Sequence, residues 1–217
     1  MLHDPLKATV LSVRIISSVD PGVAKAFDLK PNQKSIGLIT TDLDDVSYTA
    51  LDEATKKADV EIVYAKSFYG GAVNANSKLA GEFIGIMAGE TPDQVRSGLN
   101  AMIEFIENGA CFYSANEDDS ICYYAHTISR TGSYLSKVAG IEEGEAIAYL
   151  IAPPIEAMYS LDAALKAADV RLAAFYGPPS ETNFGGGLLT GSQSACKAAC
   201  DAFKNAVISF ATNPKDY

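Results

Sequence analysis

Leu51 to Val60 read L-D-E-A-T-K-K-A-D-V, and Leu161 to Val170 read L-D-A-A-L-K-A-A-D-V. Leucine, aspartate, alanine, lysine, alanine, aspartate and valine recur at matching places, all at one fixed separation. Self-similarity at a fixed separation is the signature of an internal repeat. Each copy leads into an apolar, strand-like segment and then into a glycine-containing loop. The chain is therefore predicted to hold two versions of one domain in tandem, over residues 1–109 and 110–217.

The composition is that of a globular protein. The chain has 217 residues, 48% hydrophobic and 20% charged, which suits two small domains. A formal net charge of -10 argues against nucleic acid or an anionic membrane as the main partner, because both require clustered Lys and Arg. No apolar run has the length of a membrane span, and no signal peptide is recognisable at the start, so the cytosol is the expected compartment.

Strands and helices alternate in the same order in both halves. The expected strands cover residues 8–17, 35–41, 61–68, 81–88, 110–114, 121–129, 145–152 and 170–176. The expected helices cover residues 21–27, 42–58, 92–108, 132–139, 155–168 and 192–211. Each half mixes both types within about 105 residues, which favours an α+β sandwich with helices on one face of a largely antiparallel sheet.

Two helices have apolar faces that can be read from helical spacing. The helix after the capping-box pattern Thr91-Pro92-Asp93-Gln94 is expected to bury Val95, Leu99, Met102, Ile103 and Ile106. The last helix is expected to bury Ala195, Ala199, Ala202, Ala206 and Phe210.

Longer motifs extend over nearly the whole chain. They are R-I-I-S at 14–17, D-D-V-S-Y-T-A-L-D-E-A-T-K at 44–56, S-R-T-G-S-Y-L-S at 129–136, A-P-P-I-E-A-M-Y at 152–159, P-P-S-E-T-N-F at 178–184 and L-L-T-G-S-Q-S-A-C-K-A-A-C at 188–200. With these motifs the chain resembles the tandem-domain shell proteins of ethanolamine-utilisation bacterial microcompartments.

The resemblance implies a fold and an assembly. Each half is expected to be a circularly permuted bacterial-microcompartment domain, a ferredoxin-like α/β sandwich. A homotrimer is expected to act as a pseudohexameric tile, with gated pores, beside other shell proteins in a cytoplasmic microcompartment shell. The duplication by itself leaves a closed monomeric sandwich equally open.

The resemblance also implies that ethanolamine binds between the two domains, with Asp44, Asp45 and Glu82 as its acidic partners. A ligand with an ammonium and a hydroxyl group needs a carboxylate for its charge and neutral polar groups for its hydroxyl. The alternative for Asp44 and Asp45 is capping and helix-dipole compensation at a helix start. The alternative for Glu82 is a solvated carboxylate on an edge strand.

Four further ligand residues are implied by the same resemblance: Phe112, Thr182, Asn183 and Phe184. The ring of Phe112 offers a face to an ammonium group, and the alternative is an ordinary core or interface aromatic. The alternative for Thr182, Asn183 and Phe184 is turn chemistry in a loop rich in Pro and Gly.

The loops at 69–77 and 177–187 correspond in the two repeats and are longer than most connections. In a trimer, such loops from three subunits can meet on the threefold axis. Tyr69 with Gly70 and Gly71, and Gly185 with Gly186, are therefore hypothesised to gate a central pore, with glycine providing the backbone freedom.

The sequence contains no recognisable catalytic or metal-binding constellation. There is no nucleophile elbow, phosphate-binding loop, zinc-protease motif or dinucleotide fingerprint. Cys111, Cys122, Cys196 and Cys200 are expected to be reduced, and the last two to be small buried thiols rather than metal ligands. We therefore expect no enzyme activity, no metal and no required cofactor, with cobalamin as a second candidate ligand. The alternative function is a small-molecule sensor or enzyme on a duplicated α+β domain.

Overall fold

A computed structural model describes residues 4–69, 79 and 81–215 of the chain. The chain forms two compact units, each with its own sheet and helices. The N-terminal unit comprises residues 7–110 together with 132–135, and the C-terminal unit comprises residues 4–6, 111–131 and 136–215. Each unit therefore includes a short piece of chain that is remote from the rest of it in sequence.

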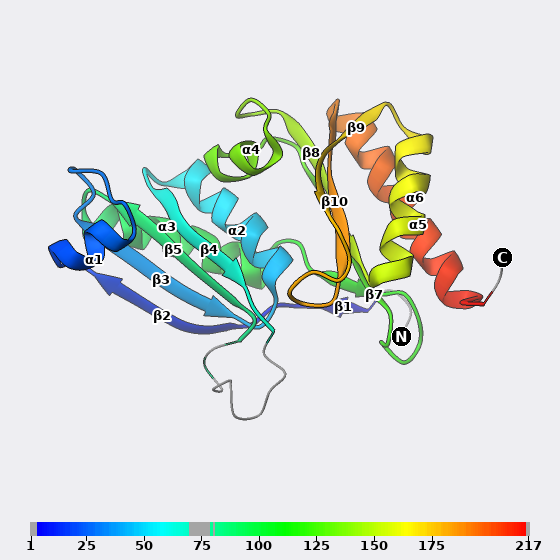
Figure 1. The fold of residues 1–217 in the computed structure, drawn as a ribbon, viewed down its shortest axis with the longest axis horizontal. Coiled ribbons are helices and arrows are strands. Elements are labelled where there is room, and N and C mark those ends of the chain that lie inside the picture. The colour runs from blue at the N-terminus through cyan, green and yellow to red at the C-terminus, as the bar shows by residue number, and fades with distance from the viewer. Residues whose placement is uncertain (1–3, 70–78, 80, 216–217) are drawn as a thin grey trace. The chain divides into compact units, whose positions relative to one another are not determined.

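The N-terminal unit is a four-stranded antiparallel sheet with two long helices on one face. The strands, in spatial order, are β2 (Val10–Ile16), β3 (Ser35–Thr41), β5 (Phe83–Gly89) and β4 (Glu61–Ser67). The helices are α1 (Pro21–Ala26), α2 (Asp44–Lys57) and α3 (Pro92–Asn108). Helices α2 and α3 pack against each other and against the sheet (Figure 1).

The two central strands of this unit, β3 and β5, are largely buried on both faces. Ile36, Ile86 and Ala88 form a small core with Phe27 and Leu29 from the α1 region. On the helical face, Gly37 lies under Val95 and Leu99 of α3, where an added Cβ would stand 2.6 Å from Val95. Val95, Leu99, Met102 and Ile106 are buried as predicted, and Ile103 is only partly buried.

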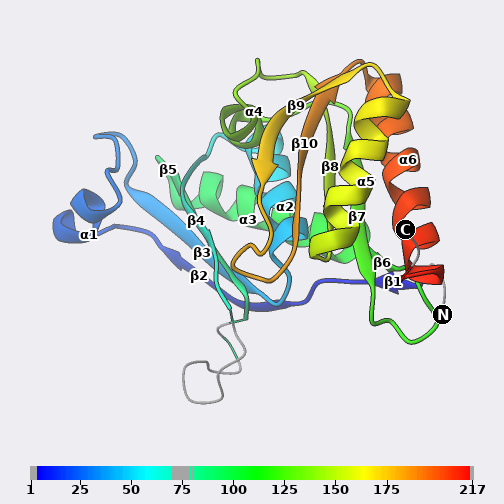
Figure 2. The same cartoon turned by 45° about the vertical axis from the view of Figure 1, so that its right-hand side comes forward.

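The C-terminal unit has the same design with two extra strands. Its strands, in spatial order, are β1 (Pro5–Leu6), β6 (Phe112–Ser114), β7 (Cys122–Ile128), β8 (Ala146–Ala152), β10 (Gly185–Gly191) and β9 (Val170–Tyr176). Its long helices, α5 (Pro154–Ala167) and α6 (Gln193–Thr212), pack side by side (Figure 2). The shorter helix α4 spans Ser133–Ala139. The α+β class with antiparallel sheets is confirmed.

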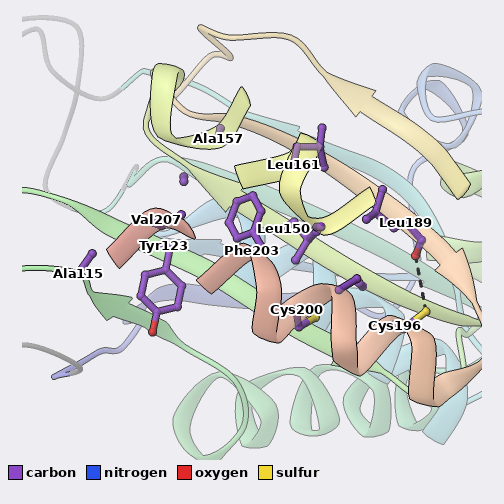
Figure 3. Packing of buried hydrophobic residues seen from close by; sticks show 14 of the residues in the cluster. Ala115, Tyr123, Leu150, Ala157, Leu161, Leu189, Cys196, Cys200, Phe203 and Val207 are labelled. Carbon is purple, nitrogen blue, oxygen red and sulfur yellow. Dashed lines mark hydrogen bonds between the residues drawn. The ribbon is translucent and has the colours of Figure 1, made fainter. Parts of the chain in front are cut away.

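The buried face of α6 differs from the prediction. Cys196, Ala199, Cys200, Phe203 and Val207 are the buried residues, whereas Ala195, Ala202, Ala206 and Phe210 are only partly buried. Figure 3 shows Phe203 among Leu150, Ala157 and Leu161, with the Cys196 thiol 3.9 Å from the carbonyl oxygen of Leu189. Larger side chains and thiols fill the core better than alanine does. The buried face of α6 is therefore shifted by about one residue from the predicted face.

The two units repeat down to local detail. In both, the last strand pair has a register shift at the same place: between Ile62 and Tyr64 in β4, and opposite Leu188 and Leu189 in β10. Val19 and Thr131 each donate the backbone N–H to the residue before the next strand, Lys34 at 2.9 Å and Glu145 at 3.0 Å. The predicted tandem duplication is confirmed. No helix in the described part of the chain is long and apolar enough to cross a membrane.

Candidate functional site

Asp44 and Asp45 open helix α2 and are both buried. The N-cap residue is Leu43, whose side chain makes no capping hydrogen bond, and the backbone N–H of Asp45 donates to the Asp44 carboxylate at 2.9 Å. Two carboxylates in the first turn suit the positive end of the helix dipole. The dipole part of the alternative explanation therefore fits, but side-chain capping by an N-cap aspartate is not how this helix begins.

Glu82 lies directly before β5, a central strand of the sheet, rather than on an edge strand. Its backbone N–H donates to Thr41 O at 2.9 Å, and its carbonyl accepts from Phe68 N at 2.9 Å. Gly81 precedes it with φ +70°, and an added Cβ there would stand 2.0 Å from Thr41 O. The tight turn thus requires glycine and fixes the position of the glutamate.

The acidic residues of the N-terminal unit influence one another electrostatically. Burial raises the pKa of Glu82, and the charges of Asp44 and Asp42 raise it further. Like charges repel, so a cation bound beside Glu82 would relieve this repulsion. Asp44 therefore lies within electrostatic range of Glu82, and Asp45 follows Asp44 on α2.

Tyr48 and Ser67 belong to the same region, and the sequence analysis missed both. The Tyr48 hydroxyl lies 2.7 Å from the Ser67 hydroxyl, and its ring packs edge-on against Phe83 with centroids 4.9 Å apart. Burial raises the pKa of Tyr48 to about 12, with contributions from Asp44 and Asp45. The signal for Tyr48 was its position one helical turn after Asp44. Nothing local to Ser67 marks it.

In the C-terminal unit, Phe112 and Phe184 are in ring contact. Phe112 is buried, with its centroid 5.9 Å from that of Phe184 in an edge-to-face arrangement and 5.3 Å from that of Tyr124. The structure thus brings together two of the predicted ligand residues of this unit. A packed aromatic cluster equally satisfies the core interpretation of Phe112.

The segment from Ser180 to Phe184 is an ordered turn. Ser180 N donates to Phe184 O at 2.7 Å, and Asn183 N donates to Ser180 O at 3.1 Å. Asn183 has φ 67°, a conformation that asparagine tolerates better than most residues. Thr182 is buried, and its hydroxyl lies 3.4 Å from that of Ser180. The turn interpretation explains the backbone conformation of Asn183.

The placement of Gly185 and Gly186 in a flexible loop is wrong, because both belong to strand β10. Gly186 has φ +147°, and an added Cβ would stand 1.9 Å from Leu150 O of the neighbouring strand. Close approach of two strands, rather than loop movement, therefore requires this glycine. Tyr69 follows β4 and is 64% exposed. Gly70 and Gly71 lie outside the described residues.

An open cavity of about 590 Å³ lies in the C-terminal unit, next to the turn at residues 180–184. It is lined by Phe175, Tyr176, Gly177, Pro179, Ser180 and Glu181. None of the predicted ligand residues lines it, so it is a second hollow beside the Thr182 turn rather than the predicted site.

Asp52 is a second residue that the sequence analysis did not single out. Its carboxylate is fully buried and accepts from Gly132 N at 2.7 Å and from Leu135 N at 2.8 Å, both within the N-terminal unit. Burial raises the pKa of Asp52. The two backbone donors and Lys56 lower it, but by less than burial raises it. The ring of Tyr134, in the same bound segment, stacks on that of Tyr48 at 6.3 Å.

The cysteines are free, as expected from the sequence. Cys111, Cys196 and Cys200 are buried, and burial raises the pKa of the Cys200 thiol to about 12. Such a thiol stays protonated and behaves as a small apolar group. Among the described residues, no group of three or more His, Cys, Asp or Glu side chains is placed to hold a metal ion.

Comparison with known proteins gives one consistent family. The BMC domain model matches residues 35–116. The bacterial microcompartment shell protein EutL of Clostridium perfringens is 68% identical over 214 residues, covering 99% of both chains. The protein of the same name from Salmonella typhimurium is 52% identical over 211 residues, covering 97% of this chain and 96% of the relative. The crystal structure of ethanolamine utilization protein EutL from Leptotrichia buccalis superposes with a TM-score of 0.98 at 70% identity, covering 100% of both chains.

Proposed function

Because the chain belongs to the EutL family of bacterial microcompartment shell proteins, we propose that it is a homotrimeric, non-catalytic tile of a microcompartment shell that binds ethanolamine and controls passage through a pore. Full-length identity to named shell proteins supports the structural role. Buried Asp44 and Asp45, with the half-buried Glu82, support a cationic ligand.

The acidic group provides the chemistry that an alkylammonium ion needs. Asp44 raises the cost of ionising Glu82, so a cation that binds beside Glu82 removes a repulsion as well as gaining an attraction. The Tyr48 and Ser67 hydroxyls, 2.7 Å apart, are neutral polar groups in the same unit. A small ligand with one ammonium and one hydroxyl group matches this set.

Calorimetry with ethanolamine tests the ligand assignment. Wild type is compared with Glu82→Gln and Asp45→Asn, and with Asp201→Asn as a matched control, since Asp201 is an exposed acid on α6. Loss of one charge-assisted hydrogen bond should weaken binding roughly tenfold or more. The control should bind as wild type does. Equal affinity in all four proteins contradicts the proposal.

Analogues separate the two ends of the ligand. Ethylamine keeps the ammonium group and should retain part of the affinity in wild type but little in Glu82→Gln. Ethylene glycol lacks the charge and should bind weakly to both. Thr182→Val forms a separate arm, which tests a buried residue of the C-terminal unit.

The pore-control part of the proposal concerns Tyr69 and the equivalent loop of the second repeat. A ligand shifts a conformational equilibrium only by binding one state better. Structures of the assembled protein with and without ethanolamine should differ at these loops, and the same loop conformation in both would remove the gating role.

Cobalamin is proposed as a second ligand, to be tested by equilibrium dialysis.

The assembly part is tested by native mass spectrometry and by electron microscopy of the concentrated protein. A trimer that forms flat sheets supports the tile. A monomer that forms no sheets favours the alternative, a sensor or enzyme on a duplicated domain.

A further inference from the structure

The side chain of Tyr48 makes three contacts within the N-terminal unit. Its hydroxyl lies 2.7 Å from that of Ser67, the last residue of β4. Its ring packs edge-on against Phe83, the first residue of β5, and Tyr134 stacks on it with centroids 6.3 Å apart and planes 15° apart. Ser67 and Phe83 are paired in the sheet, whereas Tyr134 comes from a segment that is remote in sequence.

That segment, residues 132–135, is anchored on α2 by Asp52. The two oxygens of the Asp52 carboxylate accept from Gly132 N at 2.7 Å and from Leu135 N at 2.8 Å. Gly132 packs so closely that an added Cβ would stand 2.7 Å from Asp52 O, and Leu135 is buried. Tyr134 lies between these two anchored residues, so its backbone is held on both sides.

Tyr48 joins this segment to the acidic group of the N-terminal unit, which consists of Asp44, Asp45 and Glu82. Tyr48 lies one helical turn after Asp44 on α2. The charges of Asp44 and Asp45 add to the effect of burial on its pKa, which is raised. Phe83, which packs against its ring, directly follows Glu82. The hydroxyl of Tyr48 is therefore a neutral polar group through which the segment can act on a ligand of these acids.

We propose that Tyr134 is a positioning residue of the ligand site, because its stacking on Tyr48 holds the Tyr48 hydroxyl where the hydroxyl end of ethanolamine binds. The inference rests on the ethanolamine binding proposed above. It adds the contact that makes the site prefer an amino alcohol to a plain amine. Offset-stacked rings change an equilibrium by roughly two- to tenfold, which sets the size of the expected effect.

Calorimetry with ethanolamine and with ethylamine tests the proposal on the full chain. Tyr134→Leu should weaken ethanolamine binding roughly fivefold, the middle of that range. Ethylamine has no hydroxyl group, so its affinity should change by less than about twofold. Tyr134→Phe keeps the ring and should bind both ligands as wild type does. Tyr64→Leu is the matched control, since it removes another half-buried tyrosine of this unit, whose ring packs on Phe27.

The pattern over the two ligands separates positioning from damage to the fold. General damage weakens both ligands alike, whereas a displaced Tyr48 hydroxyl weakens ethanolamine alone. An equal loss for both ligands in Tyr134→Leu, or a Tyr134→Phe that loses as much as Tyr134→Leu, would overturn the inference. If wild type binds no ethanolamine, the proposed site is wrong and the inference with it. If wild type binds ethanolamine and Tyr134→Leu binds it as tightly, only the inference is wrong.

A double variant tests the role of the anchor. Asp52→Asn keeps the size of the side chain but removes the charge that accepts from the segment. It should weaken ethanolamine binding in the same direction as Tyr134→Leu. The combined variant should lose no more than Tyr134→Leu alone, because both changes act through one contact. Losses that add in the combined variant would show that Asp52 and Tyr134 act separately, which contradicts the inference.

Hydrogen exchange gives a readout on the wild-type chain. If an ordered segment improves ethanolamine binding, bound ethanolamine must stabilise the segment by the same factor. The amides of Gly132 and Leu135 should therefore exchange roughly fivefold more slowly with saturating ethanolamine than with saturating ethylamine. Equal exchange with the two ligands would overturn the inference.

Discussion

Helices α2 and α5 start from nearly the same sequence and have different surroundings. The Leu-Asp-x-Ala-x-Lys-x-Ala-Asp-Val pattern begins in the last turns of both helices, and both pack on one face of an antiparallel sheet. Yet Asp52 of α2 is fully buried under residues 132–135, and the side chain of Asp162 of α5 is mostly exposed. The difference shows that a repeated side chain can be structural in one copy and still accessible to a partner in the other.

The cause lies outside the repeated segment. Asp52 receives two backbone donors because Gly132 permits a close approach to α2. A buried carboxylate is tolerated only when it is hydrogen-bonded and its charge is balanced. Lys56, 3.5 Å away, provides the balancing charge. Asp162 satisfies the same need with Lys166 and solvent.

Removing the carboxylates should have the largest and most unequal effect. Asp52→Ala should lower the free energy of unfolding by about 3 kcal/mol, since two buried N–H groups lose a charged acceptor. Asp162→Ala removes one exposed ion pair, worth roughly 0 to 1 kcal/mol. Urea denaturation followed by circular dichroism measures both.

Protein concentration provides the control for this pair. The loss in Asp52→Ala should be the same at every concentration, because the contact lies within one chain. If Asp162 contacts a second copy, its variant should instead change how the denaturation midpoint depends on concentration. Equal losses in the two variants would mean that burial of Asp52 has no energetic consequence.

The glycine on the bound segment should have the next largest effect. Gly132→Ala places a Cβ 2.3 Å from Thr55 Oγ1, and overpacking of this kind costs about 1 to 3 kcal/mol. Asp20→Ala, at the equivalent position, should cost about 1 kcal/mol through loss of the helix cap. Thermal unfolding of both variants at low concentration measures the difference. A tolerated Gly132→Ala would show that α2 and the segment can move apart freely.

Much of the fold could be predicted, because it follows from local patterns. Strands at 35–41 and 170–176 agree with the structure to the residue, and the capping box at Thr91 is formed as expected. The short strand β1 was missed, since two residues carry no periodicity. The face of α6 was misjudged because alanine spacing was followed, whereas Phe203 and Val207 have larger apolar side chains to bury.

The candidate site was only partly predictable. Asp44, Asp45 and Glu82 were assigned through resemblance, and the structure shows Asp44 and Glu82 to be electrostatic neighbours. The pairing of Tyr48 with Ser67 depends on tertiary contact and has no sequence signal. Gly186 looked like a hinge in sequence, because a glycine needed for close strand packing and one needed for movement look alike.

Replacing the lysines of the two helices should change the free energy of unfolding less than replacing the aspartates does. Lys56→Met leaves the buried Asp52 without its balancing charge and should cost about 1 kcal/mol, well below the loss of the carboxylate itself. Lys166→Met breaks an exposed pair at i and i+4, worth about 0.3 to 0.5 kcal/mol. Added salt should reduce the second effect more than the first. A larger loss for Lys166→Met would reverse the buried and exposed roles assigned to the two helices.

The smallest effect comes from the residue before the equivalent strands β5 and β10, which is Glu82 in the first repeat and Phe184 in the second. Burial and the nearby Asp44 and Asp42 raise the pKa of Glu82 above its ordinary value of 4.5. A carboxyl with a raised pKa binds its proton more tightly in the folded state. Its ionisation therefore lowers stability as pH rises from the unfolded pKa through the folded one.

Glu82→Gln should remove this loss, so the stability of the variant relative to wild type should increase across that range and then stay constant up to neutral pH. Urea denaturation at a series of pH values measures the difference. The opposite slope would mean that Glu82 already has a cationic partner in the folded chain. Bound ethanolamine should reduce the slope in wild type and leave Glu82→Gln unchanged.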